Sequence, residues 1–469
     1  MDRFYKTFQS ESAVIISKNK TITSSELQKK VLSATEYILE KGIKENDRVV
    51  ILGNNSIDFI ILILALWEIK AVPVPLNFNL SDKELLLILV KLSPKKILYD
   101  INLNKLHGLR NQKNISFPFN YSSSKKEKKE NRKLDLETTA LIIFTSGSSG
   151  KPKGVKLSFN NLIKSAEAQN NFLELNQHDK YLASLPFYHV GGFSIIIRML
   201  LSGGTIIIPN SLKIDDLIDS ITKYQVTSVS LVTTQLKRII DKNFIRQLTD
   251  YLKNILIGGS FINNNLIAKS FDEGLPIIKV YGSTETCSFI TAKRINSKND
   301  ISNSLGNIIG SNKMKVVDNY IAVKGESVMQ GYFNQHTDFT TDGYFVTEDI
   351  GFIDSNNELI IEGRREDIII SGGENISLRE IENLVTEFYK IEDAVVTGLE
   401  DDEWGEIVAV VVVSLDNEIF PLIELNNFLS DKIAKYKLPK RLFFVDNIPR
   451  NEMGKVLKNE LLKIIKPNE

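Results

Sequence analysis

The sequence predicts an α/β protein with a large N-terminal domain of mainly parallel sheets with helices and a small α+β C-terminal domain. Short apolar runs alternate with segments of helical apolar spacing between residues 13 and 282, which is typical of βαβ units. After residue 303 the pieces become shorter and richer in turns, and a compact αβ unit of about a hundred residues follows from Asp367. At 469 residues the chain is also too long for one ordinary core.

The composition is that of an ordinary globular protein, with 42% hydrophobic and 25% charged residues. Basic and acidic residues are equal at 58 each, so bulk charge gives no argument for nucleic acid or an anionic membrane as a partner. A single cysteine excludes an intrachain disulfide framework and indicates a reducing cytoplasm. The longest apolar run, Phe59 to Trp67, is too short to cross a bilayer, so we expect a buried helix and no membrane insertion. The sequence does not determine the oligomeric state, and a homo-oligomer is compatible with it.

The N-terminal part of the pattern gives clear elements. Thr23, followed by Glu26, is a candidate N-cap for a first helix. A charged, low-complexity stretch at 122–133 is expected to be a solvated connector at a subdomain joint. The expected strands are 13–17, 48–52, 71–75, 97–99, 141–144, 155–157, 181–185, 205–208, 228–232, 255–257 and 277–281, and the expected helices include 54–69 and 81–92.

The apolar strand at 141–144 leads into a loop of small residues, hydroxyls and lysines. Its residues are Thr145, Ser146, Gly147, Ser148, Ser149, Gly150, Lys151, Pro152, Lys153 and Gly154. Glycine backbone can approach a ligand closely, and successive N–H groups with hydroxyls and lysines suit a polyphosphate. A Walker loop is excluded because Lys151 is followed by Pro152 rather than Ser or Thr and a helix. A lone GSSG would more simply be a surface loop, but the whole stretch after a buried strand predicts a phosphate loop.

Further motifs follow other strand ends, where open α/β sheets place ligands. In Val280–Thr286, Tyr281 can stack on a purine, Thr284 can donate to a phosphate and Glu285 can hold Mg²⁺. The plain alternative is a glycine turn followed by a capped helix. Gly258, Gly259 and Ser260 end another strand, and His189 with Gly191 ends a third.

Further motifs with charged residues lie at 345–351, 361–367 and 448–455. Taken in chain order between residues 144 and 455, the motifs resemble the acyl-adenylate-forming ligases, the superfamily of acyl-CoA synthetases, luciferases and peptide-synthetase adenylation domains. The resemblance implies ATP and Mg²⁺, coenzyme A as co-substrate, a small carboxylic acid as substrate and the fold of that superfamily with a mobile small domain. It also implies a boundary at 365/366 between a large domain, 1–365, and a small domain, 366–469.

The resemblance implies a role for each motif. Residues 145–150 with Lys153 and Gly154 would bind phosphates, residues 258–260 the adenine side, and Tyr281 with Gly282 the base. The remaining roles fall on Asp349 for the ribose hydroxyls, Arg364 for ribose or phosphate, Glu366 as the hinge, Gly372 and Gly373 for the pantetheine chain, and Lys455 for the attacking carboxylate and α-phosphate. Glu366 is a mild departure, since the family commonly has Asp or Lys at the hinge, so the resemblance does not fix the exact pivot residue.

The acyl pocket is expected around His189, which would be a gate, with Gly191, Ser194 and Arg198. Ser194 and Arg198 are one helical turn apart, and an Arg among Ile and Met residues needs a partner. A second substrate carboxylate would serve bidentately, or an internal Asp or Glu would pair with it. The segment 189–198, with 228–236 and 434–439, resembles the o-succinylbenzoate–CoA ligases of menaquinone biosynthesis.

Three alternatives remain at this point. The chain could be a ligase for another aryl or fatty acid, a free-standing adenylation protein that loads a carrier protein, or a non-catalytic nucleotide-binding relative. Cys287 follows the Thr284–Glu285 motif and is expected to be a small buried residue. The mechanism implied by the resemblance is adenylation of a carboxylate followed by rotation of the small domain and thioester formation.

Overall fold

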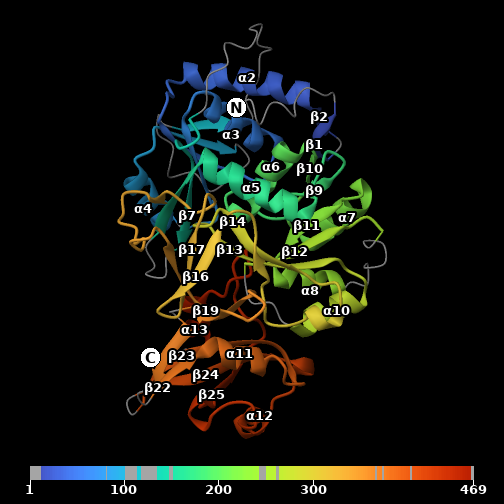
Figure 1. Cartoon of the computed structure of the whole chain (residues 1–469), viewed down its shortest axis with the longest axis vertical. Helices are drawn as coiled ribbons and strands as arrows, with labels where there is room; N and C mark the ends of the chain where they lie inside the picture. The colour runs from blue at the N-terminus through green and yellow to red at the C-terminus, as the bar shows by residue number, and fades with distance from the viewer. Residues whose placement is uncertain are drawn as a thin grey trace.

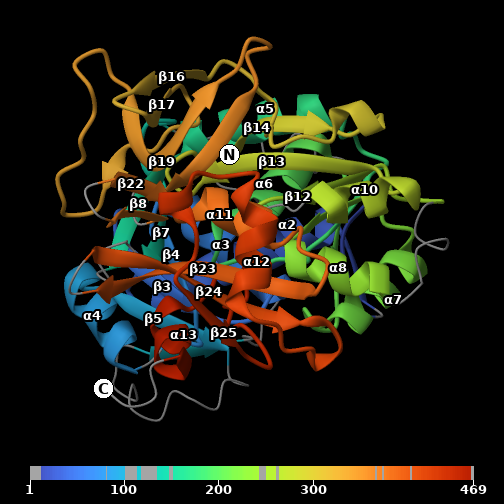
Figure 2. The same cartoon turned by 90° about the horizontal axis from the view of Figure 1, so that it is seen from below.

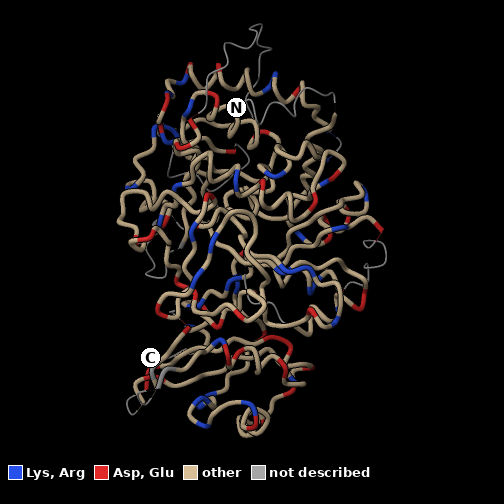
Figure 3. Tube along the Cα trace, viewed as in Figure 1, with Lys and Arg blue, Asp and Glu red and all other residues tan. Residues whose placement is uncertain are grey.

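The computed structural model of the chain describes residues 12–18, 20–80, 82–100, 114–117, 135–146, 152–241, 250–259, 264–364, 367–371, 374–401 and 404–465. These residues form a large lobe, with a smaller C-terminal lobe beneath it (Figure 1). The charged stretch at 122–133 lies outside the described residues. Both signs of charge are interspersed along the trace of the two lobes (Figure 3).

A nine-stranded sheet is the largest in the molecule, with the order β15-β14-β13-β12-β11-β9-β10-β1-β2. The six strands from β13 to β1 are parallel, whereas β2, β14 and β15 at the two edges are antiparallel to their neighbours. The strands are β1 (Ala13–Ser17), β2 (Lys20–Thr23), β9 (Lys180–Leu182), β10 (Thr205–Ile208), β11 (Ser228–Leu231), β12 (Asn254–Ile257), β13 (Ile277–Ser283), β14 (Ser288–Arg294) and β15 (Asn307–Ile308).

A second sheet of four parallel strands has the order β4-β3-β5-β6. Its strands are β3 (Arg48–Leu52), β4 (Val72–Leu76), β5 (Lys96–Asp100) and β6 (Asn114–Phe117). The main core joins strands of this sheet and the nine-stranded sheet through helices α2 (Ser24–Glu40), α3 (Ile57–Glu68), α5 (Phe159–Leu173) and α6 (Val190–Ser202). Helices α7 (Ile214–Tyr224), α8 (Thr233–Asp241) and α10 (Asn264–Asp272) pack on the large sheet in a second core, while α4 (Asp82–Leu92) lies beside the four-stranded sheet.

Helix α3 is the buried centre of the large lobe, as its apolar run predicts. Every residue from Phe59 to Trp67 is buried. Trp67 donates from Nε1 to the carbonyl oxygen of Ala140 at 2.7 Å and lies edge-on to Phe159 and Phe193. Helix α2 also begins where the sequence predicts, because Thr23 accepts from the Glu26 N–H at 3.3 Å and the Glu26 carboxylate accepts from the Thr23 N–H.

The expectation of mainly parallel sheets holds for these two sheets and fails for two others. A three-stranded sheet, β18-β8-β7, and a four-stranded sheet, β16-β17-β19-β20, are antiparallel throughout. Their strands are β7 (Thr139–Ser146), β8 (Pro152–Ser158), β16 (Lys313–Val317), β17 (Tyr320–Lys324), β18 (Gly331–Tyr332), β19 (Phe345–Ile353) and β20 (Leu359–Arg364). Consecutive strands joined by short turns pair as hairpins, whereas parallel neighbours need a helical crossover.

The small lobe has a sheet of its own, β22-β21-β24-β23, with β25 added parallel to β24. Its elements are β21 (Ile368–Ser371), β22 (Glu374–Ser377), α11 (Leu378–Val385), β23 (Ile391–Asp401), β24 (Gly405–Ser414), α12 (Leu422–Ser430), β25 (Arg441–Phe444) and α13 (Lys458–Ile465). Two hydrophobic clusters of this lobe contain no residue of the large one. Seen from below, the lobe covers the middle of the large domain (Figure 2).

Short 3₁₀ turns occur at Lys298–Asp300, Leu415–Asn417 and Lys435–Lys437. Among the described helices, none combines the length and apolarity that a bilayer crossing requires. The molecule therefore consists of two domains with separate cores, joined where β20 ends at Arg364 and β21 begins at Ile368. The predicted hinge, Glu366, lies between these strands and outside the described residues.

Candidate functional site

The predicted phosphate loop lies at the tip of the β7–β8 hairpin. Thr145 pairs with Lys153, and Phe144 pairs with Gly154. A Cβ on Gly154 would come within 3.0 Å of the Phe144 ring, so glycine lets the two strands close beneath that ring. Gly147, Ser148, Ser149 and Gly150 lie outside the described residues, as does the side chain of Ser146. Their phosphate contacts stay a prediction.

Lys153 of this hairpin is connected through Tyr332 to the predicted metal ligand, Glu285. Its Nζ lies 3.2 Å from Glu348 Oε1 and 5.3 Å from the centre of the Tyr332 ring. The Tyr332 hydroxyl in turn donates to Glu285 Oε1 at 3.0 Å, and burial together with Glu285 raises the pKa of Tyr332 well above its usual range. Glu348 lies in the motif of Asp349 but had no predicted role, and Tyr332 lies outside every motif because nothing in its local pattern marks it.

Glu285 stands in the turn that joins β13 to β14, next to Thr284. A Cβ on Gly282 would lie 2.1 Å from the carbonyl oxygen of Ser288, so the close approach of these strands requires glycine. Within the described residues, no group of three or more His, Cys, Asp or Glu side chains gathers as a metal site. A single carboxylate fits Mg²⁺ that is held mainly by water and substrate phosphates.

Two glycines at the end of β12 lie beside β13. A Cβ on Gly258 would meet the Val280 side chain at 2.7 Å and its carbonyl oxygen at 2.9 Å. Gly259 has a φ of +81°, a left-handed conformation that favours glycine. The backbone of Gly259 is thus exposed at the end of a parallel strand, while Ser260 lies outside the described residues. Contact with the adenine side stays a prediction.

Tyr281, Asp349 and Arg364 form one hydrogen-bonded cluster. The Tyr281 hydroxyl donates to Asp349 Oδ2 at 2.7 Å, and Arg364 Nε donates to Asp349 Oδ1 at 2.8 Å. Asp349 is 5% exposed. Burial, followed by the nearby Asp349 charge, raises the pKa of Tyr281 well above its usual range, so the phenol stays protonated. Each carboxylate oxygen retains a lone pair for a further donor.

The acyl-side residues gather at the start of α6. His189 is the N-cap residue without a side-chain cap bond, and a Cβ on Gly192 would lie 2.1 Å from the Pro186 carbonyl oxygen. Ser194 Oγ donates to the Gly191 carbonyl oxygen at 3.0 Å and lies 3.3 Å from Ser288 Oγ. The helix therefore packs tightly against both the preceding loop and the strand that follows Glu285.

The His189 ring contacts the Tyr188 ring at a tilt of 58°, with ring centroids 4.8 Å apart. Burial lowers the pKa of His189 to about 4, an effect that the Glu452 carboxylate partly opposes. The imidazole is therefore neutral near pH 7, which suits a pocket wall.

Arg198 is 1% exposed and lies within the core of the large domain. Its Nη1 donates to Gln169 Oε1 at 3.3 Å, and its guanidinium lies over the rings of Tyr181 and Phe289 at 4.8 and 5.6 Å. Its Nε is buried without a hydrogen-bond partner in the described structure. Within the described residues Arg198 also has no ion pair, which goes against the internal Asp or Glu alternative. Burial lowers the pKa of Arg198, although a guanidinium remains charged.

Cys287 is buried, as expected, and burial raises the pKa of its thiol to about 12. A thiol that stays protonated is a poor nucleophile.

Lys455 lies in a tight turn of the small domain. The Asn451 side chain accepts from the Lys455 N–H at 2.9 Å, and the Asn451 N–H donates to the Lys455 carbonyl oxygen at 2.8 Å. A Cβ on Gly454, which has a φ of +73°, would lie 3.6 Å from both Val232 and Thr234 of the large domain. The turn is therefore docked on the large domain.

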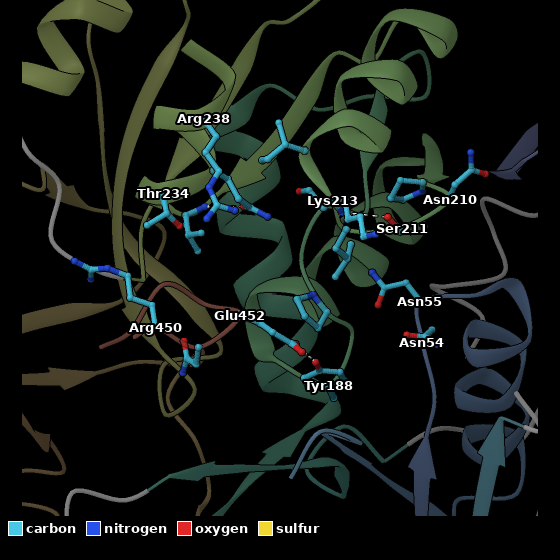
Figure 4. A pocket seen from close by; sticks show the side chains of 18 of the residues that line it. Asn54, Asn55, Tyr188, Asn210, Ser211, Lys213, Thr234, Arg238, Arg450 and Glu452 are labelled. Carbon is cyan, nitrogen blue, oxygen red and sulfur yellow. Dashed lines mark hydrogen bonds between the residues drawn. The ribbon is translucent and has the colours of Figure 1, made fainter. Parts of the chain in front are cut away.

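An open cleft of about 1720 Å³ lies between the two domains. Figure 4 shows Tyr188 and Glu452 at one place on its wall, with Arg450, Thr234, Arg238 and Lys213 around the rest. The predicted pantetheine glycines, Gly372 and Gly373, lie outside the described residues.

Comparison with known proteins follows this division into two domains. Residues 2–333 match the AMP-binding enzyme family, and residues 380–455 match the AMP-binding enzyme C-terminal domain. The 2-succinylbenzoate–CoA ligase of Staphylococcus epidermidis is 32% identical over 469 residues, covering 97% of this chain and 96% of the relative.

A solved relative is the o-succinylbenzoate CoA synthetase of Bacillus subtilis. Its complex with the acyl-adenylate intermediate is 27% identical, covers 98% of this chain and 97% of its own, and has a TM-score of 0.88. Its complex with ATP and a magnesium ion has the same TM-score of 0.88. A double mutant bound to a product analogue, at similar coverage, has a TM-score of 0.72.

Proposed function

Because the chain belongs to the AMP-binding enzyme family, we propose that it is an ATP-dependent acid–CoA ligase that converts 2-succinylbenzoate to 2-succinylbenzoyl-CoA for menaquinone biosynthesis. The observation that carries this choice of acid is Arg198, a buried guanidinium that has no ion pair within the described residues. A buried charge is costly unless it is paired, and a second carboxylate on the substrate would pair with it. The likeness to the two ligases supports the same acid.

In the first half-reaction, an oxygen of the substrate carboxylate attacks the α-phosphorus of ATP, and the bond to the β-phosphate breaks to release pyrophosphate. Tyr281 supports the base, and Asp349 accepts from the ribose hydroxyls while Arg364 holds it. Lys153, Thr284 and the loop at 145–150 contact the phosphates. Lys455 neutralises the charge that grows at the attacked phosphate, so catalysis consists mainly of positioning and electrostatic stabilisation.

Glu285 is the residue that would hold Mg²⁺, and Tyr332 orients its carboxylate. When bound, the cation would neutralise negative charge on the phosphates. Pyrophosphate release therefore depends on Glu285 even though it touches no reacting carbon.

In the second half-reaction, the thiol of coenzyme A attacks the carbonyl carbon of the acyl-adenylate, and AMP leaves with the bonding electron pair. We place the domain boundary at 365/366 and the hinge at Glu366, about which the small domain rotates to bring Gly372 and Gly373 to the pantetheine chain. The difference between TM-scores of 0.88 and 0.72 for two states of one relative supports such a rotation. His189 and Gly191 line the acyl pocket.

The test is pyrophosphate release by the purified chain with ATP, Mg²⁺ and coenzyme A. The acids are 2-succinylbenzoate, benzoate, 4-coumarate, octanoate and palmitate. Strong preference for 2-succinylbenzoate is the expected result. Preference for a monocarboxylate would keep the adenylation mechanism and overturn the proposed acid, whereas turnover that requires a carrier protein in place of free coenzyme A would overturn the ligase assignment.

A further inference from the structure

Glu452 stands in the same turn as Lys455 but contacts the other domain. The turn is stiff, because the Asn451 side-chain oxygen accepts from the N–H groups of Met453 and Lys455 at 3.0 and 2.9 Å. The Gly454 N–H also donates to the Asn451 carbonyl oxygen at 2.9 Å. A displacement of the Glu452 backbone therefore displaces Lys455 with it.

The Glu452 carboxylate accepts from two side chains of the large domain. The Tyr188 hydroxyl donates to Oε2, and the Asn79 amide donates to Oε1. Figure 4 shows the Glu452 side chain pointing toward Tyr188 on the wall of the cleft. Hydrogen bonds to a carboxylate are stronger than those between neutral groups, so the two donors hold the turn more firmly than a neutral pair would.

Tyr188 connects Glu452 to His189, which is proposed to line the acyl pocket. Tyr188 is 4% exposed, and its ring contacts the rings of Phe78 and His189, with centroids 5.7 and 4.8 Å away. Phe78 directly precedes Asn79 in the chain, so the ring that contacts Tyr188 is next to the second donor to Glu452. His189 then begins α6, the helix that carries Ser194 and Arg198.

We propose that Glu452 is a positioning residue that fixes Lys455 for adenylation by binding Tyr188 and Asn79, and thereby couples the acyl-pocket wall to closure of the small domain. The inference rests on the proposed two-step function. The hydrogen bonds of Glu452 to Tyr188 and Asn79 must break when the small domain rotates. Glu452 therefore assists adenylation and has no role in thioester formation.

The test measures both half-reactions separately. Glu452→Ala is expected to lower the kcat of acid-dependent ATP–pyrophosphate exchange roughly tenfold, the size expected for hydrogen bonds to a charged group, with little change in the KM for ATP. Single-turnover thioester formation from pre-made acyl-adenylate is expected at the wild-type rate or faster. Glu452→Gln, which retains one acceptor for Tyr188, is expected to recover part of the exchange rate.

Two further variants identify the contact itself. Tyr188→Phe keeps the aromatic ring and removes the donor, so its effect should not add to that of Glu452→Ala in the double variant. The matched control is Glu392→Ala, since Glu392 also joins the two domains through Lys237 Nζ at 3.1 Å but lies outside the Lys455 turn. An exposed pair of this kind contributes little, so its exchange rate should stay within about twofold of wild type.

Three outcomes would overturn the inference while the wild type remains active. They are an unchanged exchange rate in Glu452→Ala, an equal loss in both half-reactions, or full additivity with Tyr188→Phe. A wild-type chain that catalyses neither half-reaction would instead overturn the proposed function.

Discussion

Asp349 and Arg364 face each other across strands β19 and β20, where Arg364 Nε donates to Asp349 Oδ1 at 2.8 Å. The Tyr281 hydroxyl donates to the other carboxylate oxygen at 2.7 Å. The carboxylate is therefore oriented by protein groups before any nucleotide arrives, and pre-organisation of this kind lowers the cost of binding.

Asp349→Ala is expected to raise the KM for ATP by roughly tenfold or more, because a charged acceptor for the ribose hydroxyls is lost. The variant also leaves the buried Tyr281 hydroxyl and Arg364 without this partner, so its melting temperature should fall. Initial rates of pyrophosphate release at varied ATP check the first effect. Tyr281→Phe, which removes one donor but keeps the carboxylate, should change the KM less; the reverse order would contradict the ribose role of Asp349.

Lys455→Ala is expected to lower adenylation by roughly a hundredfold, as for loss of one donor to the transition state. Thioester formation from pre-made acyl-adenylate should survive, because the turn is withdrawn from the phosphate in that step. Rapid-quench measurement of the rates of adenylation and thioester formation tests this expectation. Equal loss in the two steps would rule out domain alternation.

Arg198→Met is expected to abolish turnover of 2-succinylbenzoate while turnover of benzoate changes little. Methionine fills much of the space left by the arginine stem, so loss of the charge is separated from loss of packing. Rates with the two acids, compared with the melting temperatures of both proteins, provide the measurement. Equal loss with both acids would make Arg198 a structural residue held by Tyr181 and Gln169.

His189 makes the stability of the large domain depend on pH. Its pKa of about 4 in the folded chain lies below the ordinary value of 6.5, so between these pH values the unfolded chain binds the extra proton. Stability is therefore fully present above pH 6.5 and falls as the pH drops toward 4, by roughly 3 kcal/mol from this group. Urea unfolding followed by circular dichroism at pH 7 and pH 4 should show a smaller loss in His189→Gln, and an equal loss in both proteins would contradict this burial effect.

The sequence was sufficient for the elements that depend on local pattern. The start of α2 at Thr23, the burial of α3 and the positions of the parallel strands follow from capping and apolar spacing. The strand-end positions of Tyr281 and of the phosphate loop also follow, since each motif comes directly after an apolar run. The mixed direction of the sheets did not follow, because alternation along one strand carries no information about its neighbour.

Contacts between distant segments could not be predicted from the sequence. Tyr332 binds Glu285 across 47 residues, and Tyr188 binds Glu452 across 264. No local pattern predicts either pairing, because only the packed domains bring the segments together. The surroundings of Arg198 illustrate the same limit: its spacing predicts a buried charge, but the rings of Tyr181 and Phe289 come from other elements.

The two domains have separate cores. Each domain contains one of the two tryptophans of the chain. Trp67 is buried in the large domain among Phe159 and Phe193, whereas Trp404 of the small domain is 42% exposed beneath Lys440. The chain thus has an intrinsic fluorophore in each unit, one shielded and one open to aqueous quenchers. With Trp404→Phe, the remaining emission would follow melting of the large domain alone, and Trp67→Phe would do the same for the small one.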